Sequence, residues 1–137
     1  MPTSPEKLSG KKILVVDDSR TIRTLLQQLL TQAGYEVVLA GDGDEGLRLV
    51  AVERPDLLIL DIQMPGMDGY TLCQSVKQMD EPWCSLPVIF ITSLESNALS
   101  LLGNQMGAYL KKPLCRDPVL EAVRCSLGSL AVEEVGG

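Results

Sequence analysis

Short continuous runs of apolar residues alternate along this chain with stretches in which apolar residues recur at helical spacing. The continuous runs predict strands at residues 12–16, 36–40, 57–61, 87–91 and 108–110. The stretches between them predict helices at residues 21–33, 45–53, 70–79, 95–106 and 117–130. The third run has no polar alternation, which is typical of a strand buried on both faces. Strands that alternate with crossover helices indicate an α/β fold, a doubly wound parallel sheet with helices on both faces.

The pattern accounts for one domain. A length of 137 residues suits a single domain, and neither a long linker nor an internal repeat interrupts the alternation. Residues 1–10 are polar and predict a short lead-in. Residues 11–130 make up the domain, and residues 131–137 are a small acidic tail.

Composition narrows the classes of function. The formal net charge is −6 and the pI is about 4.6, so neither nucleic acid nor membrane insertion is expected. The chain has no apolar export segment and no run long enough to span a bilayer, so we expect a cytoplasmic protein. It contains no histidine, which excludes Ser-His-Asp catalysis and histidine-ligated metals. The four cysteines form no C-x-x-C pair and are expected to be free thiols.

Polar side chains that could bind a ligand or take part in a reaction lie at the carboxyl ends of the predicted strands. They are Asp17 and Asp18 after the first strand, Asp61 at the end of the third, Thr92 and Ser93 after the fourth, and Lys112 after the fifth. With the strand order 2-1-3-4-5, the first and third strands are neighbours at the topological switch point, so three carboxylates converge in one cleft. Two such charges about 4 Å apart repel by roughly 4 kcal/mol at an effective dielectric of about 20. A hard divalent cation such as Mg²⁺ relieves that repulsion.

Each of these residues also has an ordinary structural explanation. The Asp17-Asp18 pair suits a turn between a strand and a helix, Thr92 suits a helix cap, and Lys112 suits a solvated charge. Four strand ends that carry this set together are hard to explain in that way. The combination therefore favours a functional site over four unrelated structural roles.

The same motifs resemble the receiver domain of two-component response regulators, including the single-domain chemotaxis regulators. The resemblance covers residues 11–130. It rests on the segments Ile-Leu-Val-Val-Asp17-Asp18-Ser, Leu-Leu-Ile-Leu-Asp61-Ile-Gln-Met-Pro65-Gly-Met-Asp-Gly69, Phe-Ile-Thr92-Ser and Tyr109-Leu-Lys-Lys112-Pro113. It implies the flavodoxin-like receiver fold, with a five-stranded parallel sheet of order 2-1-3-4-5 and five helices.

The resemblance also implies a role for each site residue. Asp61 would accept a phosphoryl group from a histidine kinase or a phosphotransfer protein. The ligands of Mg²⁺, or of Mn²⁺ in its place, would be Asp17, Asp18, Asp61 and the Gln63 backbone carbonyl. Thr92 and Lys112 would contact the phosphoryl oxygens, and the small Ser93 would leave room for them. Thr92 and Tyr109 would form the switch, and the Lys112–Pro113 peptide bond would be cis.

The implied function is a phosphorylation-controlled switch of a phosphorelay that signals through protein contacts. Such a protein catalyses only its own Mg²⁺-dependent phosphorylation and dephosphorylation and is otherwise no enzyme. A phosphatase with an aspartyl-phosphate intermediate is one rival, although Gln63 stands where a D-x-D arrangement needs its second carboxylate. A constitutive adaptor that is never phosphorylated is a second rival. The alternative is that the chain is the excised receiver of a larger multidomain regulator or hybrid kinase.

The expected output is a protein contact, either with a downstream target or in a homodimer. Few residues follow the start of the last predicted helix near Asp117, too few for a DNA-binding effector domain. We expect the contact on the surface of the fourth helix, the fifth strand and the fifth helix. Its residues would be Leu99, Tyr109, Lys111 and Cys115. One feature departs from the family: Ala108 directly precedes Tyr109, so the loop before the fifth strand is shortened.

Overall fold

The computed structural model describes residues 10–92 and 108–136, without the side chains of residue 108 and of residues 128–136. Its strands are β1 (Lys12–Val16), β2 (Glu36–Ala40), β3 (Leu57–Asp61), β4 (Val88–Thr92) and β5 (Ala108–Lys111). All neighbouring strands are parallel, in the order β2-β1-β3-β4-β5. The predicted fold class and strand order are therefore confirmed. The predicted helix at 95–106, with Leu99, and also Ser93 lie outside the described residues.

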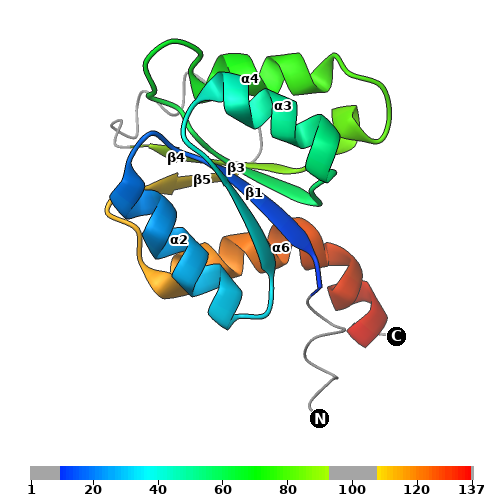
Figure 1. Ribbon diagram of the computed structural model, residues 1–137. Coiled ribbons are helices and arrows are strands. Elements are labelled where there is room, and N and C mark those ends of the chain that lie inside the picture. Colours follow the sequence, from blue (N-terminus) through cyan, green and yellow to red (C-terminus); the bar gives the residue numbers. More distant parts are fainter. Residues whose placement is uncertain (1–9, 93–107, 137) are drawn as a thin grey trace.

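Helices cover both faces of the sheet (Figure 1). The described helices are α2 (Arg20–Gln32), α3 (Gly43–Glu53), α4 (Gly69–Lys77) and α6 (Arg116–Gly136), with a 3-10 turn η1 (Trp83–Ser85). The pair α3 and α4 lies on one face and the pair α2 and α6 on the other (Figure 1). None of these described helices is long and apolar enough to cross a lipid bilayer.

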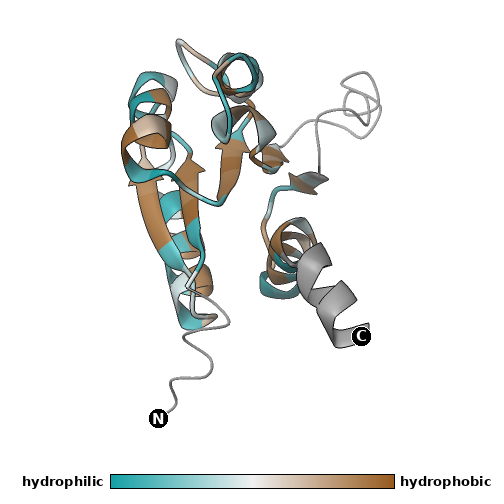
Figure 2. Ribbon diagram, turned by 90° about the vertical axis from the view of Figure 1, so that its right-hand side faces the viewer, coloured by the Kyte–Doolittle hydropathy of each residue, from teal (hydrophilic) through white to brown (hydrophobic). Residues whose placement is uncertain are grey.

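The sheet divides the core into two apolar clusters, because successive side chains of a strand point to opposite faces. Leu14 and Val16 of β1 belong to the cluster under α3 and α4, which also contains Phe90. Ile13 and Val15 belong to the cluster under α2 and α6. The strands are mostly hydrophobic and lie between the helices (Figure 2). This burial on both faces explains the uninterrupted apolar runs of the sequence.

Each of the three N-terminal helices begins at a side-chain cap. The Ser19 side chain accepts a hydrogen bond from the Ile22 N–H and starts α2. Asp42 caps α3 and Asp68 caps α4 in the same way. Since α2 and α4 are the next elements after β1 and β3, these caps fix where each helix begins after the two strands that carry the carboxylates.

The largest difference from the predicted elements lies at the C-terminal end of the chain. The last helix continues to Gly136, whereas the sequence pattern predicted its end near Leu130. Alanine and glutamate, which are good helix formers, lie in this extension at Ala131, Glu133 and Glu134. The other boundaries within the described residues agree with the predicted ones or differ by at most two residues, which is ordinary for helix and strand ends. Cys73, Cys84, Cys115 and Cys125 are all free thiols.

Candidate functional site

Asp61 is the last residue of β3, the most enclosed strand of the sheet. Its four predecessors, Leu57 to Leu60, are fully buried, and Asp61 itself is only 1% exposed. One carboxylate oxygen, Oδ1, accepts a hydrogen bond from the Gln63 N–H at 3.1 Å. Apolar packing of the strand therefore holds a carboxylate at the carboxyl edge of the sheet, where ligands bind in folds of this type.

Asp17 is a second buried carboxylate, at the end of the neighbouring strand β1. It is fully buried, and its Oδ1 accepts a hydrogen bond from the Ser19 N–H at 2.7 Å. Its Oδ2 is buried without a hydrogen-bond partner. Lys112 Nζ lies 3.5 Å from Oδ2, which is an ion-pair distance but leaves the hydrogen-bonding capacity of that oxygen unused.

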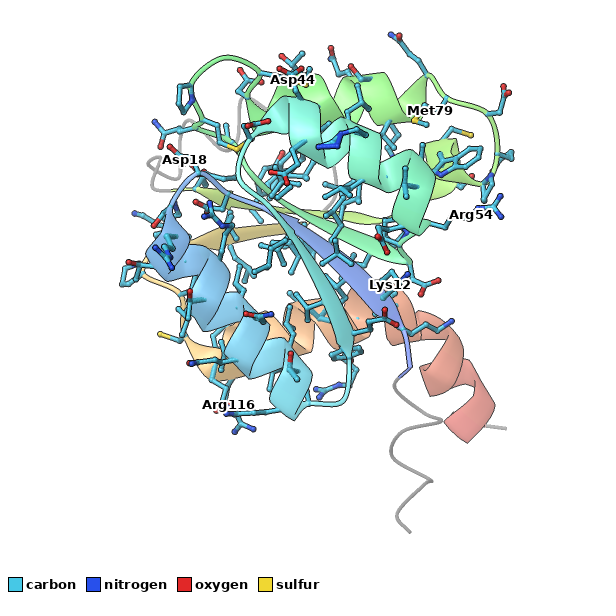
Figure 3. The ribbon with its side chains drawn as sticks, viewed as in Figure 1. Lys12, Asp18, Asp44, Arg54, Met79 and Arg116 are labelled. Carbon is cyan, nitrogen blue, oxygen red and sulfur yellow. The ribbon has the colours of Figure 1, made fainter. Side chains whose placement is uncertain are left out.

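Asp18 completes a group of three carboxylates. Its side chain is exposed and lies where β1 turns into α2 (Figure 3). Asp17, Asp18 and Asp61 each present one oxygen, and these atoms all lie within 4.8 Å of one another. The three carboxylates therefore converge at the ends of two neighbouring strands, as predicted.

Lys112 brings a positive charge to this group from β5 and the residues after it. Its Nζ lies 3.5 Å from Asp61 Oδ2 and the same distance from Asp17 Oδ2. Its main-chain N–H donates to the Thr92 carbonyl at 2.8 Å, so the ends of β4 and β5 are joined beside the cleft. The Lys112–Pro113 bond is cis, as predicted.

The electrostatics of the group are dominated by excess negative charge. Burial, followed by the charge of Asp17, raises the pKa of Asp61 to about 6. Lys112 and the Gln63 N–H act in the opposite direction but do not compensate. One lysine therefore leaves the three carboxylates under-neutralised.

These residues fit a hard divalent cation. Oxygen ligands in a cluster, two of them on buried carboxylates, are what Mg²⁺ prefers. Asp17 Oδ2 gives the fit a specific observation: this buried anionic oxygen has no hydrogen-bond partner and shares one lysine with Asp61, so a further cation would stabilise it. Among the described residues, this is where acidic side chains gather closely enough to hold a metal ion.

Residues 13–124 match the response regulator receiver domain family. The chain belongs to this family. It is a two-component response regulator receiver domain, and its role is in signal transduction. The motifs that carried the resemblance at the sequence level thus identified the correct family.

Three relatives show how far the similarity extends. The alkaline phosphatase synthesis transcriptional regulatory protein PhoP of Bacillus subtilis is 38% identical over 120 residues, which cover 86% of this chain and 49% of PhoP. The chemotaxis protein CheY4 of Vibrio cholerae is 33% identical with a TM-score of 0.79, over 87% of this chain and 100% of CheY4. The receiver domain of a Pseudomonas aeruginosa sensor histidine kinase is 28% identical with a TM-score of 0.78, over 88% of this chain and 99% of that domain.

Two further facts come from these comparisons. The Pseudomonas receiver domain was solved with a magnesium ion coordinated in its active site cleft. This receiver domain spans about half the length of the curated relatives it matches, which include transcriptional regulators.

The two predicted switch residues occupy different environments in this receiver domain. Thr92 is fully buried at the end of β4. Tyr109 is half-buried and stacks on Phe90 with ring centroids 5.6 Å apart. Burial, with Tyr70 and Cys73 nearby, raises the pKa of Tyr109. Tyr109 thus packs against the core under α4.

Gly69 is a residue whose importance sequence reasoning missed. It is the first residue of α4, and its N–H donates to the Ile62 carbonyl at 3.2 Å. A Cβ atom at this position would lie 2.8 Å from the carbonyl carbon of Asp61. The sequence shows Gly69 as the last residue of the Asp61 segment, but only the path of the folded chain brings it against Asp61. A side chain at 69 would displace the end of β3.

Proposed function

We propose that this receiver domain accepts a phosphoryl group on Asp61 from a histidine kinase or a phosphotransfer protein. One observation carries the proposal: three carboxylates, two of them buried, converge within 4.8 Å beside a lysine that lies 3.5 Å from both buried ones. That arrangement costs stability and suits the binding of a cation and a phosphoryl group.

Mg²⁺, or Mn²⁺ in its place, would be held by Asp17, Asp18, Asp61 and the Gln63 backbone carbonyl. The bound ion would supply positive charge that neutralises these carboxylates and the oxygens of the incoming phosphoryl group. Asp17 Oδ2, which is buried and accepts no hydrogen bond, supports this assignment. The magnesium ion in the related Pseudomonas receiver domain supports it independently.

In the transfer step, a carboxylate oxygen of Asp61 forms a bond to phosphorus while the bond between phosphorus and the donor histidine nitrogen breaks. The electron pair of the broken bond stays with the imidazole. A pKa of about 6 keeps Asp61 mostly ionised at neutral pH, as a nucleophile must be. Lys112 and the Thr92 hydroxyl would contact the phosphoryl oxygens, and Ser93 would leave space for them.

Phosphorylation would change the surface through Thr92 and Tyr109. The new charge would attract Thr92 and Lys112, and the packing of Tyr109 on the other side of β5 would change in response. The expected output face carries Tyr109 with the exposed residues Lys111 and Cys115; Leu99 would extend it. The partner on this face would be a downstream protein or a second copy of the chain.

The alternative is that this domain serves as the receiver of a longer regulator or hybrid kinase. The observation in favour is that the matched relatives are about twice as long. Asp61 would have the same role in that setting, but the phosphorylated face would contact another domain of the same protein. Any DNA contact would belong to that other domain.

Phosphotransfer from radiolabelled histidine kinases and phosphotransfer proteins of the source organism tests the proposal. At least one donor is expected to label the wild type within seconds to minutes and to leave Asp61→Asn unlabelled. Equal labelling of both proteins would contradict the proposal.

The output face has its own test. Beryllofluoride, a mimic of the phosphoryl group, should change amide exchange in residues 108–116 and in the segment 95–106. Changes confined to α3 and α4 would contradict this output face.

A further inference from the structure

Arg23 is a charged residue of α2 that reaches back to the acidic cluster without joining it. Its guanidinium Nη1 donates to the main-chain carbonyl of Asp17 at 2.7 Å. Its own N–H donates to the Ser19 carbonyl at 3.0 Å as part of the first turn of α2. The side chain is half-buried. Arg23 thus touches the backbone that carries the carboxylates and none of the carboxylate oxygens in the contacts described.

The carbonyl that Arg23 holds belongs to the peptide group between Asp17 and Asp18. Because a peptide group is planar, holding this oxygen fixes the rotation of the unit to which both side chains are attached. The other groups of Asp17 are also anchored: its N–H donates to the Ala40 carbonyl at 3.1 Å, and its Oδ1 accepts from Ser19. Only Oδ2 is left for the cleft.

Gly41 confines the guanidinium from the other side. A Cβ atom at Gly41 would lie 3.2 Å from Nη1 and 3.7 Å from the guanidinium carbon of Arg23, so the planar group packs closely on this glycine. Gly41 is in turn held by Glu45, whose Oε1 accepts the Gly41 N–H at 2.9 Å. Arg23 therefore joins the carboxyl ends of β1 and β2, and its position is fixed by both.

We propose that Arg23 is a positioning residue for the cation site: it orients the Asp17–Asp18 peptide so that both carboxylates face the metal. This inference rests on the proposed binding of Mg²⁺ at the cluster. Arg23 acts through the backbone of Asp17 and does not contact the cation or the phosphoryl group.

Charge and positioning predict opposite effects for Arg23. As a mere positive charge close to a cation site, Arg23 would weaken Mg²⁺ binding, and its neutralisation would tighten binding. As a positioning residue, it strengthens binding, and its loss weakens it. Residues that orient metal ligands typically account for 10- to 100-fold in metal affinity, so we expect Arg23→Met to lose about 10-fold.

The test is calorimetric titration of the whole chain with MgCl₂, with urea unfolding measured in parallel. The variants are Arg23→Met, Arg23→Lys and the control Arg20→Met. Arg23→Lys keeps the charge but not the planar donor group, and it covers the case in which Arg23→Met does not fold. Arg20 is exposed on the same helix, so Arg20→Met removes a charge without touching Asp17.

The positioning role predicts weaker Mg²⁺ binding by both Arg23 variants, more so by Arg23→Met, and binding close to wild type by Arg20→Met. Folded Arg23 variants that bind Mg²⁺ as tightly as the wild type, or more tightly, would overturn the inference even if they unfold at lower urea concentration. A wild type that does not bind Mg²⁺ would instead refute the proposed function, so the two failures are distinguishable.

Discussion

Two lysines at opposite ends of the sheet each pair with two carboxylates and are similarly exposed, but the carboxylates at the two ends differ in burial. Lys12 opens β1, far from the turn that carries Asp18 (Figure 3). Its Nζ lies 3.1 Å from Glu53 and 3.7 Å from Glu36, and its side chain is 23% exposed. Lys112 lies 3.5 Å from each of two aspartates and is 25% exposed. The number of partners and the exposure of the lysines do not distinguish the two ends.

The acidic partners distinguish them. The side chains of Glu36 and Glu53 are 63% and 35% exposed, so water screens their charge. Those of Asp17 and Asp61 are 0% and 2% exposed. At the amino end, hydrogen bonding to Glu53 raises the pKa of Lys12, and the group is satisfied. At the carboxyl end, a buried oxygen lacks a hydrogen-bond partner.

Access of water to the carboxylates therefore separates the ion pairs at the amino end of the sheet from the candidate site at the carboxyl end. Exposed pairs of this kind contribute about 0–1 kcal/mol and tolerate change. Buried carboxylates with too little positive charge destabilise the fold unless a ligand neutralises them. The same residue types therefore stabilise one edge of the sheet and leave excess buried negative charge at the other, where a ligand would relieve it.

The same substitution at the two ends gives the largest contrast. Lys112→Met should slow phosphorylation of Asp61 by about 100-fold or more, because it removes a positive charge aimed at the phosphoryl oxygens. Lys12→Met should leave that rate unchanged and lower the free energy of unfolding by at most about 1 kcal/mol. Rates from quenched time courses and urea unfolding measure both effects. Equal rate losses in the two variants would remove the distinction between the ends.

The raised pKa of Asp61 predicts a pH dependence of stability. The folded-state pKa of about 6 lies above the value of 3.8 for a free carboxyl group. Protonated Asp61 therefore favours folding below about pH 4, and this contribution is lost as pH rises through 6. Above that pH the ionised carboxylate destabilises the metal-free protein by an amount on the order of 3 kcal/mol.

Asp61→Asn isolates the contribution of Asp61 ionisation to the free energy of unfolding, because asparagine does not ionise. Between pH 4 and pH 7, the variant should gain on the order of 3 kcal/mol of unfolding free energy relative to the metal-free wild type. Saturating Mg²⁺ at pH 7 should narrow the difference. The measurement is urea unfolding across this pH range with and without Mg²⁺. A pH-independent difference would show that burial does not perturb Asp61.

Two glycines of the segment that follows β3, Gly66 and Gly69, give a smaller and more local contrast. Gly69→Ala places a methyl group against the Asp61 backbone and should cost about 2 kcal/mol of stability and slow phosphorylation. Gly66→Ala meets no atom within 4 Å but has a φ of 78°, so it should cost only about 1 kcal/mol and leave the rate intact. A rate loss in Gly66→Ala as large as that in Gly69→Ala would point to the loop as a whole.

The sequence was sufficient to predict the strands, their order in the sheet and most of the acidic cluster. Continuous runs such as Leu57 to Leu60 are informative because only a doubly covered strand buries every residue. The convergence of Asp17 and Asp61 followed from topology, since the carboxyl ends of parallel strands meet at one edge. The predicted helix at 95–106 and the role of Ser93 stay predictions.

Other features depend on the path of the chain. Asp17 and Asp18 are identical neighbours in the sequence, yet one is fully buried and the other exposed. That difference arises from where β1 ends and which face each residue takes. The contacts of Gly69 with Asp61 and of Arg23 with the Asp17 carbonyl join residues by loop geometry, which periodicity does not encode.

The central claim is that Asp61 is the phosphorylated residue and that a divalent cation is required. The most direct test needs no kinase: incubation with acetyl phosphate and MgCl₂, followed by intact mass measurement of the wild type and Asp61→Asn. We expect a gain of one phosphoryl group by the wild type, none by Asp61→Asn, and none by either protein in EDTA. Phosphorylation of Asp61→Asn to the wild-type level, or full phosphorylation of the wild type in EDTA, would contradict it.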